Sequence, residues 1–293
     1  MSDKVAKMVT DQFIKMIEEG LADGKWSPCW NKAAAMPRNV VTGKNYRGIN
    51  ILLLWNAQYQ EGYEHSIWGT FKQWNDKGYK LKDAKGKGKM IVHWNIIERE
   101  ETAKDGSTVI KTIPSLRYYT VFNCAHVEGY EPENAATNKL DISERISEID
   151  SVIAATGANI QYGGDRACFI PSVDMIQMPR FEDFHDAHGF YSTTFHELAH
   201  WTGHKSRLDR DLTGRFGDHA YGMEELVAEL SAAFTCAELG IDPIARDDHV
   251  KYIKSWLVQI KEDSRAILTA ASKAAQASEY ILECSANENT KAA

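Results

Sequence analysis

The stretch TFHELAHWTGH, residues 194–204, decides the fold expected for the second half of this chain. It places His196 and His200 four residues apart, with Glu197 directly after the first histidine. On an α-helix this spacing puts both imidazoles on one face, and HExxH on a helix is a ligand pattern of catalytic zinc sites. We therefore expect a helix over residues 192–202, started by Ser and Thr, that carries two metal ligands.

A catalytic site of this kind takes three protein ligands, so one more has to come from elsewhere. His204 is near in sequence, but Gly203 is expected to end the helix and turn it away from the metal. The metzincin pattern HExxHxxGxxH also fails, because position 206 is Ser206 where that pattern needs histidine.

A second helix, expected over residues 223–239, offers better candidates for the third ligand. Glu225 and Glu229 are one helical turn apart on a face lined by small residues, whereas Glu224 is expected to be solvated. We favour Glu229 as the ligand and keep Glu225 as the alternative. The other member of the pair is expected to hydrogen-bond a ligating imidazole.

The open position of such a metal gives Glu197 a role as general base in peptide hydrolysis. Zinc is the expected ion, although the same ligands accept manganese, cobalt or nickel. An electrophile for the developing oxyanion is also needed. Its candidates are Tyr191, His204, His219 and Tyr221.

Charge divides the sequence into unlike halves. Residues 1–120 carry 19 Lys and Arg against 13 Asp and Glu, whereas the remainder carries 15 against 28. A basic half joined to an acidic one suggests a polyanion binder attached to a second function. The chain has no long apolar run and no apolar signal core, and its five cysteines are widely spaced, so we expect a cytoplasmic protein with reduced thiols and no membrane partner.

Hydrophobic periodicity predicts an α+β protein of two domains. The first domain, residues 1–125, is expected to contain helices near 4–19, 49–59 and 70–76 and a hairpin of residues 90–98 and 109–123. Residues 126–140 lack periodicity and are expected to form a linker.

The second domain, residues 141–293, is expected to be mainly helical. Short strands are expected near residues 158–162, 167–170 and 174–178, the last at a sheet edge. Besides the two helices that supply the metal ligands, helices are expected over 142–155, 243–260 and 265–284.

Lysines and arginines of the first domain alternate with aromatic residues in two segments, 36–48 and 70–90. Cations bind phosphates and rings stack on unpaired bases, so the pattern favours a single-stranded DNA interface. The candidate contacts are Arg38, Lys44, Tyr46, Arg47, Lys72, Trp74, Lys82, Lys85 and Lys87. Most of the tryptophans are expected to lie in the core.

Five segments together resemble the plasmid-borne antirestriction proteins of the ArdC type and the related N-terminal part of conjugative primases. They are PRNVVTGKNYRGINILLLW, WGTFKQW, GKGKMIVHW, HELAHWTGHKSRLDR and YGMEELVAELSAAFTCAELGI. The resemblance implies an N-terminal α+β domain that binds single-stranded DNA without sequence preference. It also implies a C-terminal zincin-like, gluzincin-type peptidase domain and a role in protecting a conjugative plasmid from restriction.

We therefore expect an antirestriction protein with single-stranded DNA and an unknown protein substrate as its partners. One alternative is a purely DNA-coating protein whose metal site is structural or inactive. A metal-dependent nuclease is disfavoured, because nucleases gather more carboxylates around two ions.

Overall fold

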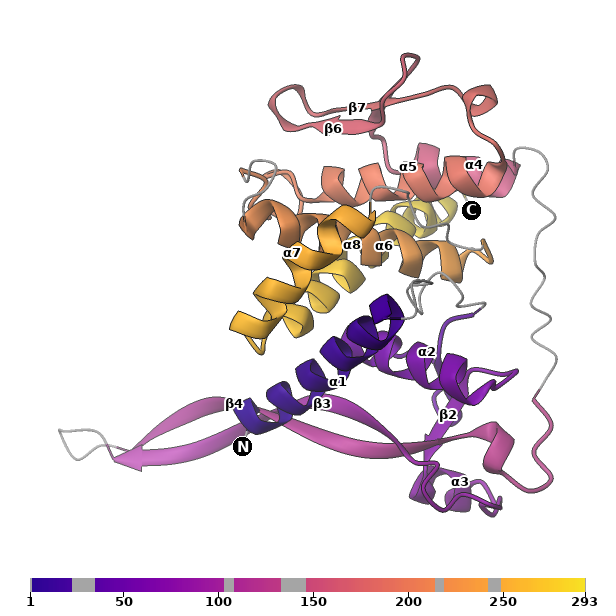
Figure 1. Ribbon diagram of the computed structural model, residues 1–293, viewed down its shortest axis with the longest axis vertical. Coiled ribbons are helices and arrows are strands. Elements are labelled where there is room, and N and C mark those ends of the chain that lie inside the picture. The colour runs from indigo at the N-terminus through magenta and orange to yellow at the C-terminus, as the bar shows by residue number, and fades with distance from the viewer. Residues whose placement is uncertain are drawn as a thin grey trace.

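The computed structural model describes residues 2–22, 35–102, 108–132, 146–213, 219–241 and 249–292. Figure 1 shows a half that contains a long hairpin below a half built mainly of helices. The mixture of helices and strands confirms the α+β class. Within the described residues, no helix is both long and apolar enough to span a bilayer.

In the described part of the first half, three α-helices accompany one sheet. Its elements are α1 (Ser2–Ala22), β1 (Arg38–Asn39), α2 (Ile49–Glu61), β2 (Ile67–Thr70), α3 (Phe71–Asp76), β3 (Lys89–Thr102), β4 (Thr108–Asn123) and the 3-10 turn η2 (Cys124–His126). The strand order is β1-β2-β4-β3, with β1 parallel to β2 and the other pairs antiparallel. The expected hairpin is confirmed, while its turn lies outside the described residues.

Helix α2 lies along the outer edge of strand β3. The Asn50 side chain accepts a hydrogen bond from the backbone N–H of Val92 and donates one to its carbonyl, each at 2.8 Å. The side chain thus satisfies both backbone groups of Val92, which a neighbouring strand would otherwise pair. Beyond this contact, β3 and β4 continue as an arm past α1 (Figure 1).

The second half places a small sheet against a group of helices. Its elements are α4 (Ser147–Ala155), β5 (Asn159–Tyr162), β6 (Cys168–Ile170), η3 (Pro171–Val173), β7 (Met175–Met178), η4 (Phe181–Asp183), α5 (Ala187–Thr202), α6 (His219–Glu238), α7 (His249–Glu262) and α8 (Ala266–Ala292). The sheet order is β5-β7-β6. The expectation that β7 is an edge strand was wrong, because β5 and β6 pair with its two sides.

The two halves share a hydrophobic core. Residues of α1, α2 and the hairpin pack in one cluster with residues of α6, α7 and α8. The rings of Trp55 on α2 and Phe234 on α6 are 5.6 Å apart between centroids. A second cluster lies between α4, β7, α5, α6 and α8. Helix α6, which carries the glutamates, is therefore packed on both sides.

The expected linker is partly ordered structure. Val127 is buried, and the N–H of Glu128 donates to the carbonyl of Lys80 at 2.9 Å, so this segment packs against the first half. Residues 133–145 lie outside the described residues. The division into domains at 1–125 and 141–293 stays a prediction.

Candidate metal centre

Helix α5 carries the HExxH stretch and begins earlier than the sequence suggested. The Asp186 carboxylate accepts a hydrogen bond from the N–H of Gly189 at 2.8 Å and caps the helix, so the expected start at Ser192 was wrong. The helix ends at Gly203, as expected. His196 and Glu197 are 3% and 2% exposed, which makes this helix a buried one rather than a solvated surface helix.

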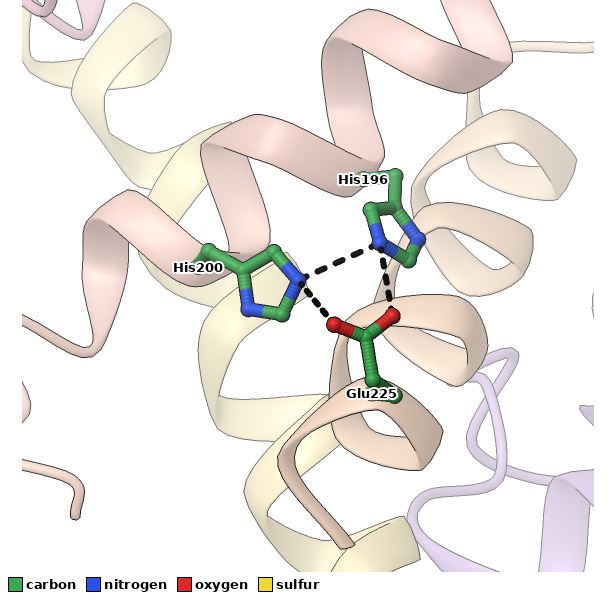
Figure 2. Close-up of side chains that lie close together, drawn as sticks. All are labelled: His196, His200 and Glu225. Carbon is green, nitrogen blue, oxygen red and sulfur yellow. Dashed lines mark hydrogen bonds and ion pairs between the residues drawn. The ribbon is translucent and has the colours of Figure 1, made fainter. Parts of the chain in front are cut away.

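Three side chains converge on one point between α5 and α6 (Figure 2). The Nε2 atoms of His196 and His200 are 3.2 Å apart, and Glu225 places Oε2 3.6 Å from the first and Oε1 3.5 Å from the second. One ligand atom from each residue lies within 4.8 Å of the others. Two imidazoles and one carboxylate fit a divalent metal ion.

The preference for Glu229 over Glu225 as the third ligand is not supported by this geometry. Glu229 Oε2 is 3.8 Å from His196 Nδ1, the ring nitrogen that faces away from the convergence point. Because Glu229 is one turn further along α6, it lies beside the Nδ1 side of His196. Glu229 is therefore placed to hydrogen-bond a ligating imidazole, which is the role expected of whichever glutamate of the pair does not bind the metal.

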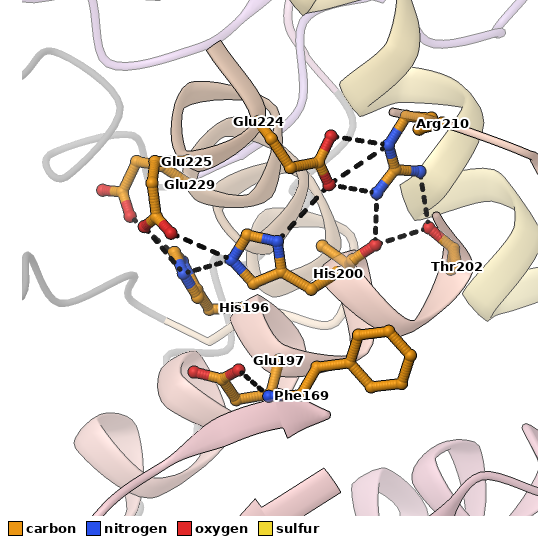
Figure 3. Close-up of polar contacts among 10 residues, drawn as sticks. Phe169, His196, Glu197, His200, Thr202, Arg210, Glu224, Glu225 and Glu229 are labelled. Atoms are coloured by element: carbon orange, nitrogen blue, oxygen red, sulfur yellow. Dashed lines mark hydrogen bonds and ion pairs between the residues drawn. The ribbon is translucent and has the colours of Figure 1, made fainter. Parts of the chain in front are cut away.

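Glu224 is not solvated, contrary to the sequence expectation. Its Oε1 is 3.3 Å from His200 Nδ1, and the Arg210 guanidinium donates to its two oxygens at 3.0 and 2.8 Å (Figure 3). Arg210 also donates to the hydroxyl of Thr202 at 2.9 Å and the carbonyl of Ala199 at 2.6 Å. Arg210 thus ties the end of α5 to the carboxylate that orients His200.

Gly203 makes room for this guanidinium. A Cβ atom at position 203 would lie 2.9 Å from Nη2 of Arg210 and 3.0 Å from the carbonyl oxygen of His200. A side chain at position 203 would therefore press on the guanidinium where it reaches the helix end. The backbone of Gly203 is right-handed (φ −74°), so the helix end does not itself require glycine, and the lack of a side chain serves the close approach of Arg210.

The carboxylates around His200 keep it positively charged. Burial opposes protonation of His200, but its hydrogen bonds to Glu224 and Glu225 outweigh burial and raise its pKa to about 10. Burial acts to raise the pKa of Glu225, but the two histidines hold that pKa below its usual range. A divalent cation that binds here has to displace the His200 proton, so metal affinity is expected to fall in acid.

Glu197 points to the small sheet. The backbone N–H of Phe169, on edge strand β6, donates to Glu197 Oε2 at 2.9 Å (Figure 3). The strand therefore fixes the direction of the carboxylate that the sequence assigns as general base. Of the candidate electrophiles, Tyr191 is excluded, since its buried hydroxyl accepts the N–H of Ile146 at 2.7 Å. The side chain of His219 lies outside the described residues, and His204 and Tyr221 stay candidates.

The residues that the sequence predicts to contact DNA lie in different environments. Trp74 is wrong as a stacking ring, because it is 0% exposed and its indole N–H donates to the carbonyl of Phe122 at 3.1 Å. Tyr46 is half-buried, and its hydroxyl accepts from Asn39 at 3.1 Å. Lys87 binds Glu61 at 2.6 Å.

The remaining candidate cations are exposed, although two of them have acidic partners. Arg47 pairs with Glu279 on α8, and Lys72 lies 2.5 Å from Asp76. The exposed set is Arg38, Lys44, Arg47, Lys72, Lys82 and Lys85.

Comparison with known proteins assigns both halves. Residues 3–122 match the family described as the N-terminal domain of anti-restriction factor ArdC, and residues 147–273 match a family of zincin-like metallopeptidases. The metal-free crystal structure of the antirestriction ArdC protein from plasmid R388 aligns with a TM-score of 0.83 and 39% identity over 96% of this chain and 98% of that one. The chain belongs to the ArdC antirestriction family.

Other relatives of this ArdC-family protein differ in length. Protein y4eC of Sinorhizobium fredii is 41% identical, over 94% of this chain and 91% of that one. Two DNA primases TraC of Escherichia coli are 34% and 32% identical, but the chain spans only 27% and 20% of their lengths. The Mn(II)-bound structure of R388 ArdC aligns with a TM-score of 0.80 and 36% identity over 96% of this chain and 98% of that one.

Replacing Glu224 by Gln in this ArdC-family protein is expected to weaken divalent-metal binding about 10- to 100-fold. The change removes the charge that holds His200 and leaves Arg210 with a neutral partner. Arg210→Ala is expected to have the same effect, with an added loss of stability because the buried Glu224 loses its guanidinium hydrogen bonds and keeps only His200. Calorimetric titration with Mn(II) measures the affinity.

Lys205→Ala is the matched control, because Lys205 is an exposed cation in the same turn. It should bind Mn(II) as the unmodified protein does. Unchanged Mn(II) affinity in Glu224→Gln would show that the Glu224 carboxylate only stabilises the turn that contains Arg210.

Proposed function

We propose that this protein binds single-stranded DNA without sequence preference through its first half and hydrolyses peptide bonds at the metal centre of its second half. Acting together, the two halves protect incoming conjugative plasmid DNA from restriction in the recipient cell. Membership in the ArdC antirestriction family supports the biological role. The convergence of His196, His200 and Glu225 beside a buried Glu197 carries the chemical part.

The proposed metal ligands are Nε2 of His196, Nε2 of His200 and the carboxylate of Glu225. Glu229 and Glu224 lie beside the Nδ1 atoms of the two histidines and orient the rings. We propose zinc as the ion, because two imidazoles and a carboxylate with an open position are its usual catalytic set. The manganese in the R388 ArdC structure shows that a relative also accepts that ion.

Glu197 is the proposed general base. A bound divalent ion acidifies water and polarises a peptide carbonyl. Glu197 then takes the proton as the water oxygen bonds to the carbonyl carbon, and delivers it to the amide nitrogen as the C–N bond breaks. The Phe169 N–H keeps the carboxylate in one orientation during both transfers.

Charge and exposure support the DNA-binding part of the proposal. The first 120 residues carry six more basic than acidic side chains, and most of the candidate cations are exposed. Primase relatives that share this region are named for an activity on DNA. Single strands are favoured because their bases are open to stacking.

A conjugation assay tests the proposed function. Transfer of an unmodified plasmid into a restricting recipient is measured with and without this protein, and a non-restricting recipient is the control. We expect the protein to raise transfer only into the restricting recipient. In gel shifts it should favour single-stranded over duplex DNA and lose affinity steeply with salt. Equal affinity for both DNA forms, or no protection, contradicts the proposal.

A further inference from the structure

The arm formed by β3 and β4 has two chemically different faces. The two strands pair without interruption from Lys89↔Val121 to Thr102↔Thr108, so opposite residues share parity and a face. Odd-numbered residues form one face and even-numbered residues the other. We call them the odd face and the even face.

The even face is directed at the core cluster that contains α1 and α2, whereas the odd face packs on a smaller cluster only at the base of the arm, where Val121 is 0% exposed beside Trp68. Val92 and Leu116 are even-numbered, 5% and 0% exposed, and belong to the core cluster that contains α1 and α2. Further along the arm the even face carries exposed rings, Trp94 and Tyr118. No even-numbered residue of either strand is Lys, Arg or His.

The odd face holds every basic residue of the two strands. His93 and Arg117 are directly opposite each other and both exposed. Tyr119 is 41% exposed, and its ring centroid is 6.4 Å from that of His93. Lys111 is exposed nearer the tip. Over residues 89–99 and 111–123 the odd positions contain no Asp or Glu.

Because the basic residues of the arm lie on the odd face, a polyanion is the ligand that this face favours. Residues on one face of a strand recur every ~6.7 Å, so Lys111 and Arg117 are about 20 Å apart. An extended ligand that lies along the strand could contact both of them. Tyr119 and His93 add rings on which unpaired bases stack, which a duplex does not offer. An apolar protein partner would instead fit the even face.

We propose that the odd face of the β3–β4 arm, at His93, Arg117 and Tyr119, is a contact surface for single-stranded DNA. The proposal rests on the proposed DNA-binding function and adds a surface that the loop lysines do not include. Arg117 binds a phosphate and Tyr119 stacks on a base. At the base of the arm, Lys89 starts β3 and binds Glu61 together with Lys87, so the lysine-rich loop leads directly into this face.

Two adjacent tyrosines provide the test. Tyr119→Ser and its matched control Tyr118→Ser remove rings from the same strand, 41% and 55% exposed, on opposite faces. Fluorescence anisotropy with labelled oligothymidylate measures affinity, and circular dichroism confirms folding. We expect Tyr119→Ser to weaken binding about 5- to 150-fold and Tyr118→Ser to leave it unchanged. Arg117→Gln should lower the salt slope by about one.

The outcomes separate this inference from the proposed function. If the unmodified protein does not bind the oligonucleotide, the proposed DNA-binding function fails, and the surface fails with it. If it binds, but Tyr119→Ser and Arg117→Gln bind equally well, the function stands and the odd face is excluded. Equal losses in Tyr118→Ser and Tyr119→Ser would also exclude it, because the effect would not follow the face.

Discussion

Glu225→Gln should lose divalent-metal affinity by more than about a hundredfold, beyond the ~10–100-fold that loss of an outer hydrogen-bonding partner costs. The amide keeps the shape of the side chain but lacks the charge that both histidine Nε2 atoms face at 3.5–3.6 Å. Calorimetric titration with Mn(II) or Zn(II) measures the loss. The increase in Tm that metal gives the unmodified protein should disappear as well.

Glu229→Gln is the matched comparison, since Glu229 is on the same helix one turn away and lies 3.8 Å from His196 Nδ1. Its affinity should fall about 10- to 100-fold. The opposite order, with Glu229→Gln the more severe change, would restore the ligand assignment that the sequence favoured.

Glu197→Gln should lower peptide hydrolysis by about 10²–10⁴-fold while leaving metal and DNA binding intact. Glutamine can still accept the Phe169 N–H through its side-chain oxygen, so the local structure is retained. What it loses is the ability to take up a proton. In the conjugation assay, protection should disappear with the activity.

Metal content and single-stranded DNA affinity are the controls for this variant, and both should match the unmodified protein. Full protection by Glu197→Gln would contradict a hydrolytic role. It would favour a protein that protects DNA by coating it.

The convergence of the two histidines in the candidate metal site was predictable, because HExxH needs only helical spacing. The sequence places His196 and His200 on one face of a helix wherever that helix lies. The choice between Glu225 and Glu229 depends instead on how far α6 is shifted along α5, which no local pattern contains. Glu224 was misjudged for a related reason, since its partner Arg210 lies in an irregular turn. Gly203, whose missing side chain leaves space for Arg210, is the local feature of the sequence from which this contact could have been predicted.

The proposed DNA interface was less predictable, because exposure depends on tertiary packing. Trp74 stands in WGTFKQW among polar residues, yet Thr70 caps helix α3 and the ring points into the core. The lysine-rich loop was predicted to contact DNA from its composition alone. The odd face of the arm is visible only when the pairing of β3 with β4 is known, because His93 and Arg117 are 24 positions apart in sequence.

A metal-bound crystal structure, with anomalous diffraction at the edge of the bound ion, tests the central claim most directly. It should show one ion bound by Nε2 of His196, Nε2 of His200 and the carboxylate of Glu225, with Glu229 hydrogen-bonded to Nδ1 of His196. An ion bound by Glu229 in place of Glu225, or no ion at this point, would contradict the account.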